Sequence, residues 1–241
     1  MARGFQCKQF FIAHDLCAMK VNTDSLILGS WATSKGAQQI LDVGCGSGIL
    51  SLMMCQRSAD DAQVLAIDIA QDAIVQTRIN ADNSPWSDRI QVRHCGLAAL
   101  TPSQPIDTII CNPPYFSDTN VGNAAHLAQS ASRQAARHQG CLSSQDLFMH
   151  ATNVTSSTAR LACLYPTSQR DIIIAHATQH DWQLDRELTV FNKQGGRSHV
   201  SAFEFSKQHG RRRKETLIIR DEKNSYTDHY KALCKDFYLA F

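Results

Sequence analysis

Continuous apolar runs alternate with stretches of helical periodicity along most of the chain. The runs predict strands at about 40–43, 63–68, 90–95, 106–111 and 159–165. The periodic stretches predict helices at about 49–57, 72–82 and 169–180, with another that opens at Ser143 or Ser144. In the helix over 72–82, Ala73, Val75 and Ile79 are expected to form the buried side. Strands that alternate with helices form a parallel sheet with helices on both faces.

The two ends of the chain depart from this alternation. Near the N-terminus a short helix is expected to bury Leu26, Ile27 and Trp31, and Thr23 or Asp24 is the predicted cap. Towards the C-terminus, apolar runs at 183–191 and 198–205 flank a glycine-containing turn and predict an antiparallel pair. A strand at 217–220 and an amphipathic helix over 226–241 are expected to follow.

Composition narrows the class of protein. The chain has 241 residues, of which 43% are hydrophobic and 19% charged, so one folded domain over 1–241 is expected. No apolar stretch reaches membrane-spanning length, and Met1-Ala2-Arg3-Gly4 does not open a signal peptide. The 9 cysteines form no C-x-x-C pair, which argues against a metal site or a disulfide framework and favours a cytoplasmic protein. A net charge of +2 means that any nucleic-acid surface must be local.

A glycine-rich turn follows the first strand of the predicted sheet. Gly44, Gly46 and Gly48 let the backbone turn tightly and approach a ligand, and the next helix offers its N-terminal N–H groups. The spacing is G-x-G-x-G rather than the dinucleotide G-x-G-x-x-G. Asp42 places a carboxylate beside this loop, which suits a ligand with a cationic amine and no pyrophosphate.

The next strand ends at Asp68, which is followed by Ile69. Asp68 lies at the spacing expected for an acid that binds a ribose diol. S-adenosylmethionine carries both the ribose and the ammonium that these two acids would bind. Taken singly, Asp42 and Asp68 could be capping or solvated acids, so the prediction depends on their order and separation.

A rigid polar turn ends the strand at 106–111. In Asn112-Pro113-Pro114-Tyr115, the residue before each proline is kept out of the helical region, so the chain stays extended. The Asn112 amide oxygen and the Pro113 carbonyl are two acceptors, and Tyr115 adds a flat ring. This arrangement fits a planar exocyclic amine, although two prolines can also simply end a strand. The glycine loop, Asp68 and this turn, in that order, resemble the site motifs of Rossmann-like class I methyltransferases. The resemblance implies a mostly parallel seven-stranded sheet with a final antiparallel pair.

Further segments resemble one family, the bacterial tRNA1(Val) adenine N6-methyltransferases. They are Lys8-Gln9-Phe10-Phe11-Ile12-Ala13-His14-Asp15, Cys17-Ala18-Met19-Lys20-Val21, Thr23-Asp24, Leu28-Gly29-Ser30-Trp31, Ser84-Pro85-Trp86-Ser87-Asp88-Arg89-Ile90 and Asp236-Phe237-Tyr238-Leu239. The resemblance implies S-adenosylmethionine-dependent methylation of adenine 37, directly 3′ of the anticodon of a valine tRNA. It also implies that Thr23 and Asp24, in a lid segment over 1–36, close over the methionine end of the cofactor. Gly96 stands where such enzymes usually carry an aspartate for the cofactor's adenine amino group.

Basic residues could contact the RNA backbone. Arg211, Arg212, Arg213 and Lys214 form a basic turn in the C-terminal segment 206–241, and Arg133 and Arg137 lie four residues apart beyond Tyr115. Arginines bind phosphate bidentately, although a charge run is more often a solvated turn. Three other functions remain open: methylation of a release-factor glutamine at N5, methylation of a ribosomal guanine at N2, and a nucleotide-binding scaffold without activity.

Overall fold

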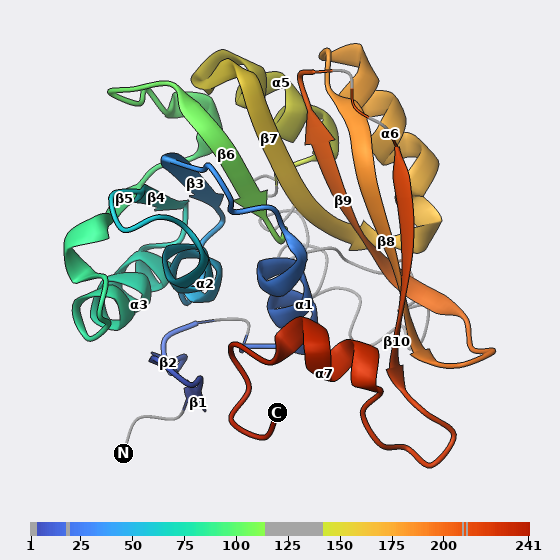
Figure 1. The fold of residues 1–241 in the computed structure, drawn as a ribbon. Coiled ribbons are helices and arrows are strands. Elements are labelled where there is room, and N and C mark those ends of the chain that lie inside the picture. Colours follow the sequence, from blue (N-terminus) through green and yellow to red (C-terminus); the bar gives the residue numbers. More distant parts are fainter. Residues whose placement is uncertain (1–3, 18–19, 114–141, 209, 211) are drawn as a thin grey trace, which may run out of the picture.

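The computed structural model describes residues 4–17, 20–113, 142–208, 210 and 212–241. Within them, an eight-stranded sheet has the order β10-β8-β9-β7-β6-β3-β4-β5 (Figure 1). Its strands are β3 (Gln39–Val43), β4 (Gln63–Asp68), β5 (Ile90–His94), β6 (Ile106–Cys111), β7 (Thr155–Pro166), β8 (Gln183–Lys193), β9 (Ser198–Ser206) and β10 (Arg213–Arg220). A separate antiparallel pair joins β1 (Gly4–Gln6) to β2 (Phe11–Ala13).

The predicted fold class is confirmed. Strand β9 runs antiparallel to β7 and β8, and the other neighbours in the large sheet are parallel. The sheet holds eight strands rather than seven because β10, expected only as a short strand at 217–220, begins at Arg213 and pairs with β8.

Helices cover both faces of the sheet (Figure 1). The helices α1 (Thr23–Trp31), α2 (Ile49–Arg57) and α7 (Asp228–Cys234) share one core, and α5 (Ser144–Val154) and α6 (Arg170–Gln179) share the other. Helix α3 (Gln71–Asp82) packs its Ile74 against Ala66 of β4. Both faces of the central strands are therefore buried, as their continuous apolar runs require.

The predicted cap of α1 was wrong by one residue. Asn22 is the cap, and its side-chain oxygen accepts hydrogen bonds from the backbone N–H of Ser25 at 2.9 Å and from the Ser25 hydroxyl at 2.6 Å. Thr23 is instead the first helical residue, because the Asn22 side chain already accepts the hydrogen bond from the Ser25 N–H that a cap provides. The apolar residues expected to face inward, Leu26, Ile27 and Trp31, are all buried.

The predicted buried side of α3 is confirmed for Ala73 and wrong for Val75 and Ile79. Ala73 is buried, whereas Val75 and Ile79 are 37% and 42% exposed, and Gln76 and Asn80 are buried in their place. Asn80 exchanges hydrogen bonds with both backbone groups of Ala13, and Gln76 accepts one from the N–H of Leu16. The N-terminal segment thus lies on this side of α3, and polar side chains are needed there to pair its backbone.

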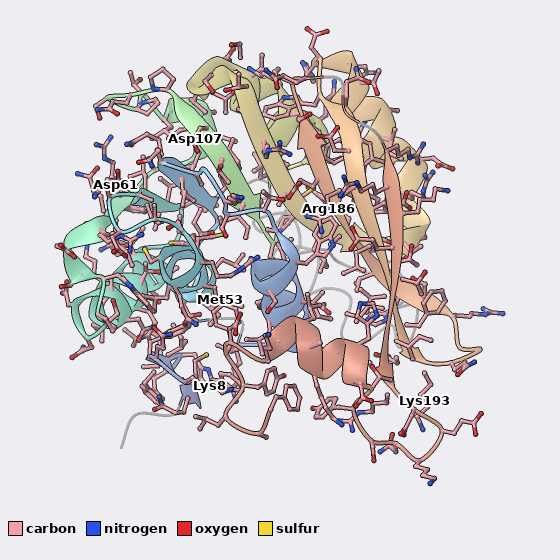
Figure 2. All side chains as sticks on the ribbon, in the orientation of Figure 1. Lys8, Met53, Asp61, Asp107, Arg186 and Lys193 are labelled. Carbon is pink, nitrogen blue, oxygen red and sulfur yellow. The ribbon has the colours of Figure 1, made fainter. Side chains whose placement is uncertain are left out.

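Helix α1 is fixed to the sheet by charged groups. The Arg186 guanidinium lies 4.3 Å from the centre of the Trp31 ring and forms an ion pair with Glu215 at 3.1 Å (Figure 2). The carboxylate of Glu204, which is 1% exposed, accepts hydrogen bonds from the backbone N–H and hydroxyl of Thr33 at 2.8 and 2.9 Å. These bonds hold the C-terminal end of α1, so the opposite end, at Asn22, has a fixed place at the carboxyl edge of the sheet.

The C-terminal helix is shorter than predicted. Only α7 is helical in 226–241, and the chain beyond it is held by an aromatic cluster of Tyr226, Tyr230, Tyr238 and Phe241. The ring of Tyr226 stacks on that of Tyr230 at 5.0 Å, and Tyr238 stacks on Phe241 at 4.7 Å. Ring packing therefore fixes the last residues where a helix was expected. In the described part of the chain, no helix is long and apolar enough to cross a membrane.

Candidate active site

Four predicted site segments meet at one edge of the sheet. In the sheet, Val43 pairs with Ile67 on one side and with Cys111 on the other. Gly44, Asp68 and Asn112 are the residues that directly follow these three, so they lie side by side at the carboxyl ends of their strands. His94 of β5 pairs with Asp68, which brings Gly96 to the same edge. In open parallel sheets, ligands bind at these carboxyl ends.

The glycine loop has a backbone conformation that favours glycine at three positions. Gly44, Gly46 and Gly48 have φ angles of 73°, 56° and 81°, in the left-handed region that side chains rarely enter. A Cβ added at Gly44 or Gly46 would meet no atom within 4 Å, so the loop borders open space on that side. The backbone N–H groups of Gly44 and Cys45 both bond to the Ile67 carbonyl, at 2.9 and 3.0 Å. The loop is therefore tied to β4 and presents its outer side to a ligand.

Asp68 organises the far side of this loop. Its Oδ2 accepts a hydrogen bond from the N–H of Gly46 at 3.0 Å, and its Oδ1 accepts one from the N–H of Ala70 at 2.9 Å. The side chain is half-buried, so it is accessible while its orientation is fixed. Each carboxylate oxygen has a second lone pair that can accept from a ribose hydroxyl.

Asp42 is a buried acid with one oxygen that lacks a partner. The residue is fully buried, and its Oδ2 accepts a hydrogen bond from the Ser51 hydroxyl at 2.6 Å. Its Oδ1 has no hydrogen-bond partner among the described residues. Burial raises the pKa of Asp42 to about 7, although the bonds from Ser51 oppose that rise. A neighbouring cation would satisfy both the charge and the open oxygen, so the site fits a nucleoside that carries an ammonium group.

Gly96 and Ile69 border the same space. Gly96 has φ −83° and ψ 159°, and a Cβ added there would lie 3.4 Å from Cγ2 of Ile69. Ile69 is 55% exposed, and its carbonyl lies 2.9 Å from Nε2 of His94. An exposed branched side chain beside a glycine offers a flat apolar contact, which suits a purine ring.

The polar turn after β6 is described only in its first half. Asn112 is half-buried and Pro113 is buried. Pro114 and Tyr115 lie outside the described residues, as do Arg133, Arg137 and Arg211. The described half places the backbone of Asn112 one residue beyond the pairing of Cys111 with Val43, at the edge that also carries the glycine loop.

The described part of the predicted basic turn, residues 212–214, lies at the opposite edge of the sheet, where β10 begins (Figure 1). Arg213 and Lys214 are the first residues of that strand rather than part of a turn; Arg213 pairs with Arg186, and Lys214 is exposed. Arg212 donates to Oε2 of the buried Glu187 at 3.3 Å, and its side chain is 45% exposed. Since β10 runs parallel to β6 through β8, β9 and β7, its first residues are far from Asn112.

Sequence reasoning missed a pocket at the carboxyl edge. Its volume is about 290 Å³, and its lining comprises Asn22, Thr23, Asp24, Asn192, His199, Ile219, Arg220 and Tyr226. The predicted lid residues Thr23 and Asp24 thus line a space that includes no residue of the glycine loop. No motif indicates this pocket, because its walls come from four separate elements. Within the described ranges, no three His, Cys, Asp or Glu residues are grouped to hold a metal ion.

The fold and this edge define an S-adenosylmethionine-dependent class I methyltransferase. The sequence matches the family described as "Methyltransferase small domain" over residues 16–144. A protein of Tolumonas auensis named tRNA1(Val) (adenine(37)-N6)-methyltransferase is 38% identical over 237 residues, which cover 98% of this chain and 97% of the relative. A protein of the same name from Bacteroides thetaiotaomicron is 34% identical over 98% of this chain and 97% of its own length. The chain belongs to the tRNA1(Val) (adenine(37)-N6)-methyltransferase family.

Solved structures agree on the fold. A predicted O-methyltransferase from Agrobacterium tumefaciens superposes with a TM-score of 0.66 at 17% identity, over 89% of this chain and 96% of that one. A putative RNA methyltransferase from Pyrococcus horikoshii gives a TM-score of 0.55 at 17% identity, over 80% and 88% of the two chains. At these identities the likeness concerns the fold alone.

Proposed function

We propose that this protein methylates N6 of adenosine 37 in the anticodon loop of a valine tRNA. The relatives named for that reaction support the substrate. The observation that carries the proposal is the position of Asn112, which follows β6 at the edge where Asp42, the glycine loop and Asp68 also lie. The proposed substrate places the enzyme in the cytoplasm.

The cofactor-binding residues have distinct tasks in this proposal. Asp68 binds the ribose hydroxyls, Asp42 faces the ammonium group, and the loop of Gly44, Gly46 and Gly48 lets the backbone approach the ligand. Ile69 and Gly96 contact the adenine ring. When bound, S-adenosylmethionine supplies an electrophilic methyl group on its sulfonium sulfur.

The polar turn prepares the target nitrogen. Adenine N6 is a poor nucleophile because its lone pair is delocalised into the ring. The Asn112 amide oxygen and the Pro113 carbonyl accept hydrogen bonds from its two N–H groups. The nitrogen therefore becomes pyramidal, and its lone pair turns out of the ring plane. Positive charge grows on N6 during transfer, and both oxygens stabilise it. Pro113 has no N–H that would compete for the same space.

Alignment supplies most of the remaining acceleration. Tyr115 is proposed to stack on the base and fix its plane, so that the lone pair lies in line with the methyl group. No strong general base is required, because a cationic N6 loses its proton to water. The base must leave its stack, which costs less in an anticodon loop than in a duplex.

Substrate identity can be tested in one experiment. The purified protein is incubated with tritium-labelled S-adenosylmethionine and, separately, with bulk tRNA, a ribosomal fraction and a release factor, and the products are digested and separated. N6-methyladenosine from valine tRNA is the expected product. N5-methylglutamine or N2-methylguanosine as the sole product would overturn the assignment in favour of the other two reactions that the same turn could serve.

A further inference from the structure

The carboxyl edge carries a second polar pocket beyond the proposed target-base site. It lies between the N-terminal end of α1, the ends of β8 and β10, and the start of β9, and none of Asp42, Gly44, Gly46 or Asp68 lines it. Strands in a sheet lie about 4.8 Å apart. The order β6-β7-β9-β8-β10 therefore puts β9 about 10 Å, and β10 about 19 Å, along the edge from Asn112.

One wall of this pocket is a guanidinium that lies over an aromatic ring. The Arg220 guanidinium carbon lies 4.2 Å from the centre of the Tyr226 ring, and its Nη1 donates to the Asn224 carbonyl at 2.8 Å. Tyr226 is itself fixed by stacking on Tyr230. The turn between them is rigid, because the N–H of Ser225 donates to Oδ1 of Asp221 at 2.8 Å. The guanidinium plane is therefore oriented before any ligand arrives.

Arg220 differs from the arginines that stabilise the sheet. Arg160, Arg170, Arg186 and Arg212 all form ion pairs with carboxylates. Arg220 forms none with the carboxylates of the described residues, and it lines the pocket with a half-exposed side chain. Its charge and plane are consequently available to a ligand.

The other walls indicate a nucleotide base rather than a phosphate alone. Asn192 offers an amide donor and acceptor, Asn22 offers the donor of its capping amide, His199 offers an exposed ring, and the negative charge of Asp24 would repel a bare phosphate. Single-stranded RNA is read by stacking bases on aromatic or arginine planes and by hydrogen bonds to their edges. A volume of about 290 Å³ lies at the lower end of the range for small-ligand sites, which suits one nucleoside.

Exposed cations lie in the turns that adjoin the pocket's walls. Lys193 and Arg197 lie at the ends of the turn between β8 and β9, and Lys223 lies in the turn after β10 (Figure 2). They are placed to contact the phosphates on either side of a bound nucleotide. This carboxyl edge, rather than the basic turn at the opposite edge, offers cations next to the proposed target site.

We propose that this pocket, the Arg220 pocket, binds one nucleotide of the substrate RNA near the methylated adenosine, with its base stacked on Arg220. The inference rests on the proposed function, since it takes the RNA to be the substrate. It adds a base-reading site to the enzyme outside the polar turn and the cofactor loop.

The test measures binding of a fluorescent anticodon stem-loop by anisotropy. Arg220→Gln is expected to weaken binding about tenfold, the typical effect of losing one stacked base. Arg220→Lys is expected to behave like Arg220→Gln, because it keeps the charge and loses the plane. Arg78→Gln is the matched control and leaves binding unchanged, because Arg78 is an exposed arginine on α3 whose side chain, among the described residues, hydrogen-bonds only to the Val92 carbonyl.

Abasic substitutions identify the bound nucleotide. One loop position other than the target, made abasic, is expected to weaken wild-type binding about tenfold and to have no further effect on Arg220→Gln. Asn192→Ala, on a different wall of the pocket, should show the same non-additivity, so the test does not depend on Arg220→Gln folding. Melting temperature and cofactor affinity report the folding of each variant.

The proposal would be overturned by full affinity in Arg220→Gln, by full affinity in Arg220→Lys, or by additive effects of variant and abasic site at every position. Loss in Arg220→Gln of binding to free nucleoside monophosphates, with RNA binding intact, would also overturn it. A wild-type protein that methylates no tRNA would refute the proposed function instead, and direct RNA binding distinguishes the two failures.

Discussion

The carboxylate of Asp68, at the end of β4, accepts a hydrogen bond from the backbone N–H of Gly46 at 3.0 Å. The acid that would bind the ribose is therefore also the acid that closes the glycine loop. Gly46 has a φ of 56°, a conformation in which its N–H points towards β4. One side chain thus links the two halves of the proposed cofactor site.

Asp68→Ala should weaken cofactor binding more than the loss of a ribose contact alone would. A hydrogen bond to a charged group contributes about 1.5–3 kcal/mol, which corresponds to a Kd about 10- to 150-fold higher. Loosening of the loop adds to this loss, and calorimetry with S-adenosylmethionine measures it. Asp61→Ala, an exposed aspartate just before β4 at the opposite edge of the sheet, is the control (Figure 2). Equal affinity in Asp68→Ala and wild type would refute the role of Asp68.

Cofactor affinity should depend on pH through Asp42. Burial raises its pKa to about 7 in the free protein, so most of the carboxyl is protonated at pH 6 and most is ionised at pH 7.5. Only the ionised form attracts an ammonium group, so the Kd for S-adenosylmethionine is expected to rise about fivefold to tenfold from pH 7.5 to pH 6. Calorimetry in two buffers of different ionisation enthalpy should also detect proton release on binding at pH 6.5.

Asp42→Asn is the matched variant for this prediction. It should bind the cofactor weakly and without that pH dependence. The pKa of Asp42 is higher in the folded than in the unfolded protein, so the group stabilises the fold below about pH 4, and this contribution is lost as pH rises through 7. Asp42→Asn should therefore be more stable than wild type at pH 8, by about 4 kcal/mol in urea unfolding, and no more stable at pH 4. A constant stability difference across this range would contradict the assignment.

The positions of the cofactor loop, its acid and the turn after β6 could be predicted because each follows a buried strand. Strand ends of a parallel sheet meet at one edge, so sequence order alone brings Asp42, Asp68 and Asn112 together. The burial of polar residues on α3 could not be predicted from apolar periodicity, which gave Ala73 correctly but Val75 and Ile79 wrongly. Gln76 and Asn80 are buried because they pair the backbone of a distant segment, and that pairing has no local signal.

The Arg220 pocket and the C-terminal chain were missed for a related reason. Arg220 and Tyr226 are ordinary residues of a strand end and a turn until β8, β9 and α1 close around them. The last residues were predicted as a helix from the spacing of Tyr230, Leu233, Phe237 and Tyr238. Helix α7 instead ends at Cys234, and the hydroxyl of Tyr238, beyond that end, lies 3.0 Å from the hydroxyl of Tyr230 within the helix.

Installing the missing acid should tighten cofactor binding. Gly96 has a backbone conformation that aspartate adopts readily, and a Cβ there would make only a van der Waals contact with Ile69. Gly96→Asp should therefore add a charged acceptor for an adenine amino group and lower the Kd for S-adenosylmethionine about tenfold or more. Gly96→Ala separates the effect of the Cβ from that of the carboxylate and should change affinity little. Unchanged calorimetric affinity in Gly96→Asp would show that Gly96 does not face the adenine.

Asn112→Ala should separate catalysis from cofactor binding. Loss of a preorganised acceptor for developing charge typically costs a factor of about 100–1,000 in rate. Affinity for S-adenosylmethionine should remain within about twofold, because the proposed cofactor contacts lie on β3, β4 and β5. Asn153→Ala, an exposed asparagine on α5, is the control and should leave single-turnover transfer unchanged. Normal turnover in Asn112→Ala would end the proposal that this amide activates N6.

The basic turn 211–214 stays a prediction, but its place in the fold changes what it could contact. The eight residues of β10, at about 3.3 Å each, separate Arg213 from the carboxyl edge by about 25 Å. A phosphate bound there belongs to a part of the tRNA distant from the anticodon loop. The double variant Arg213→Gln, Lys214→Gln should therefore weaken binding of full-length tRNA and flatten its salt dependence by about two released counterions. Binding of the isolated anticodon stem-loop should not change. An equal loss of affinity for both RNAs would mean that the anticodon arm binds at the turn. Unchanged affinity for both would mean that the turn is only solvent-exposed and contacts no RNA.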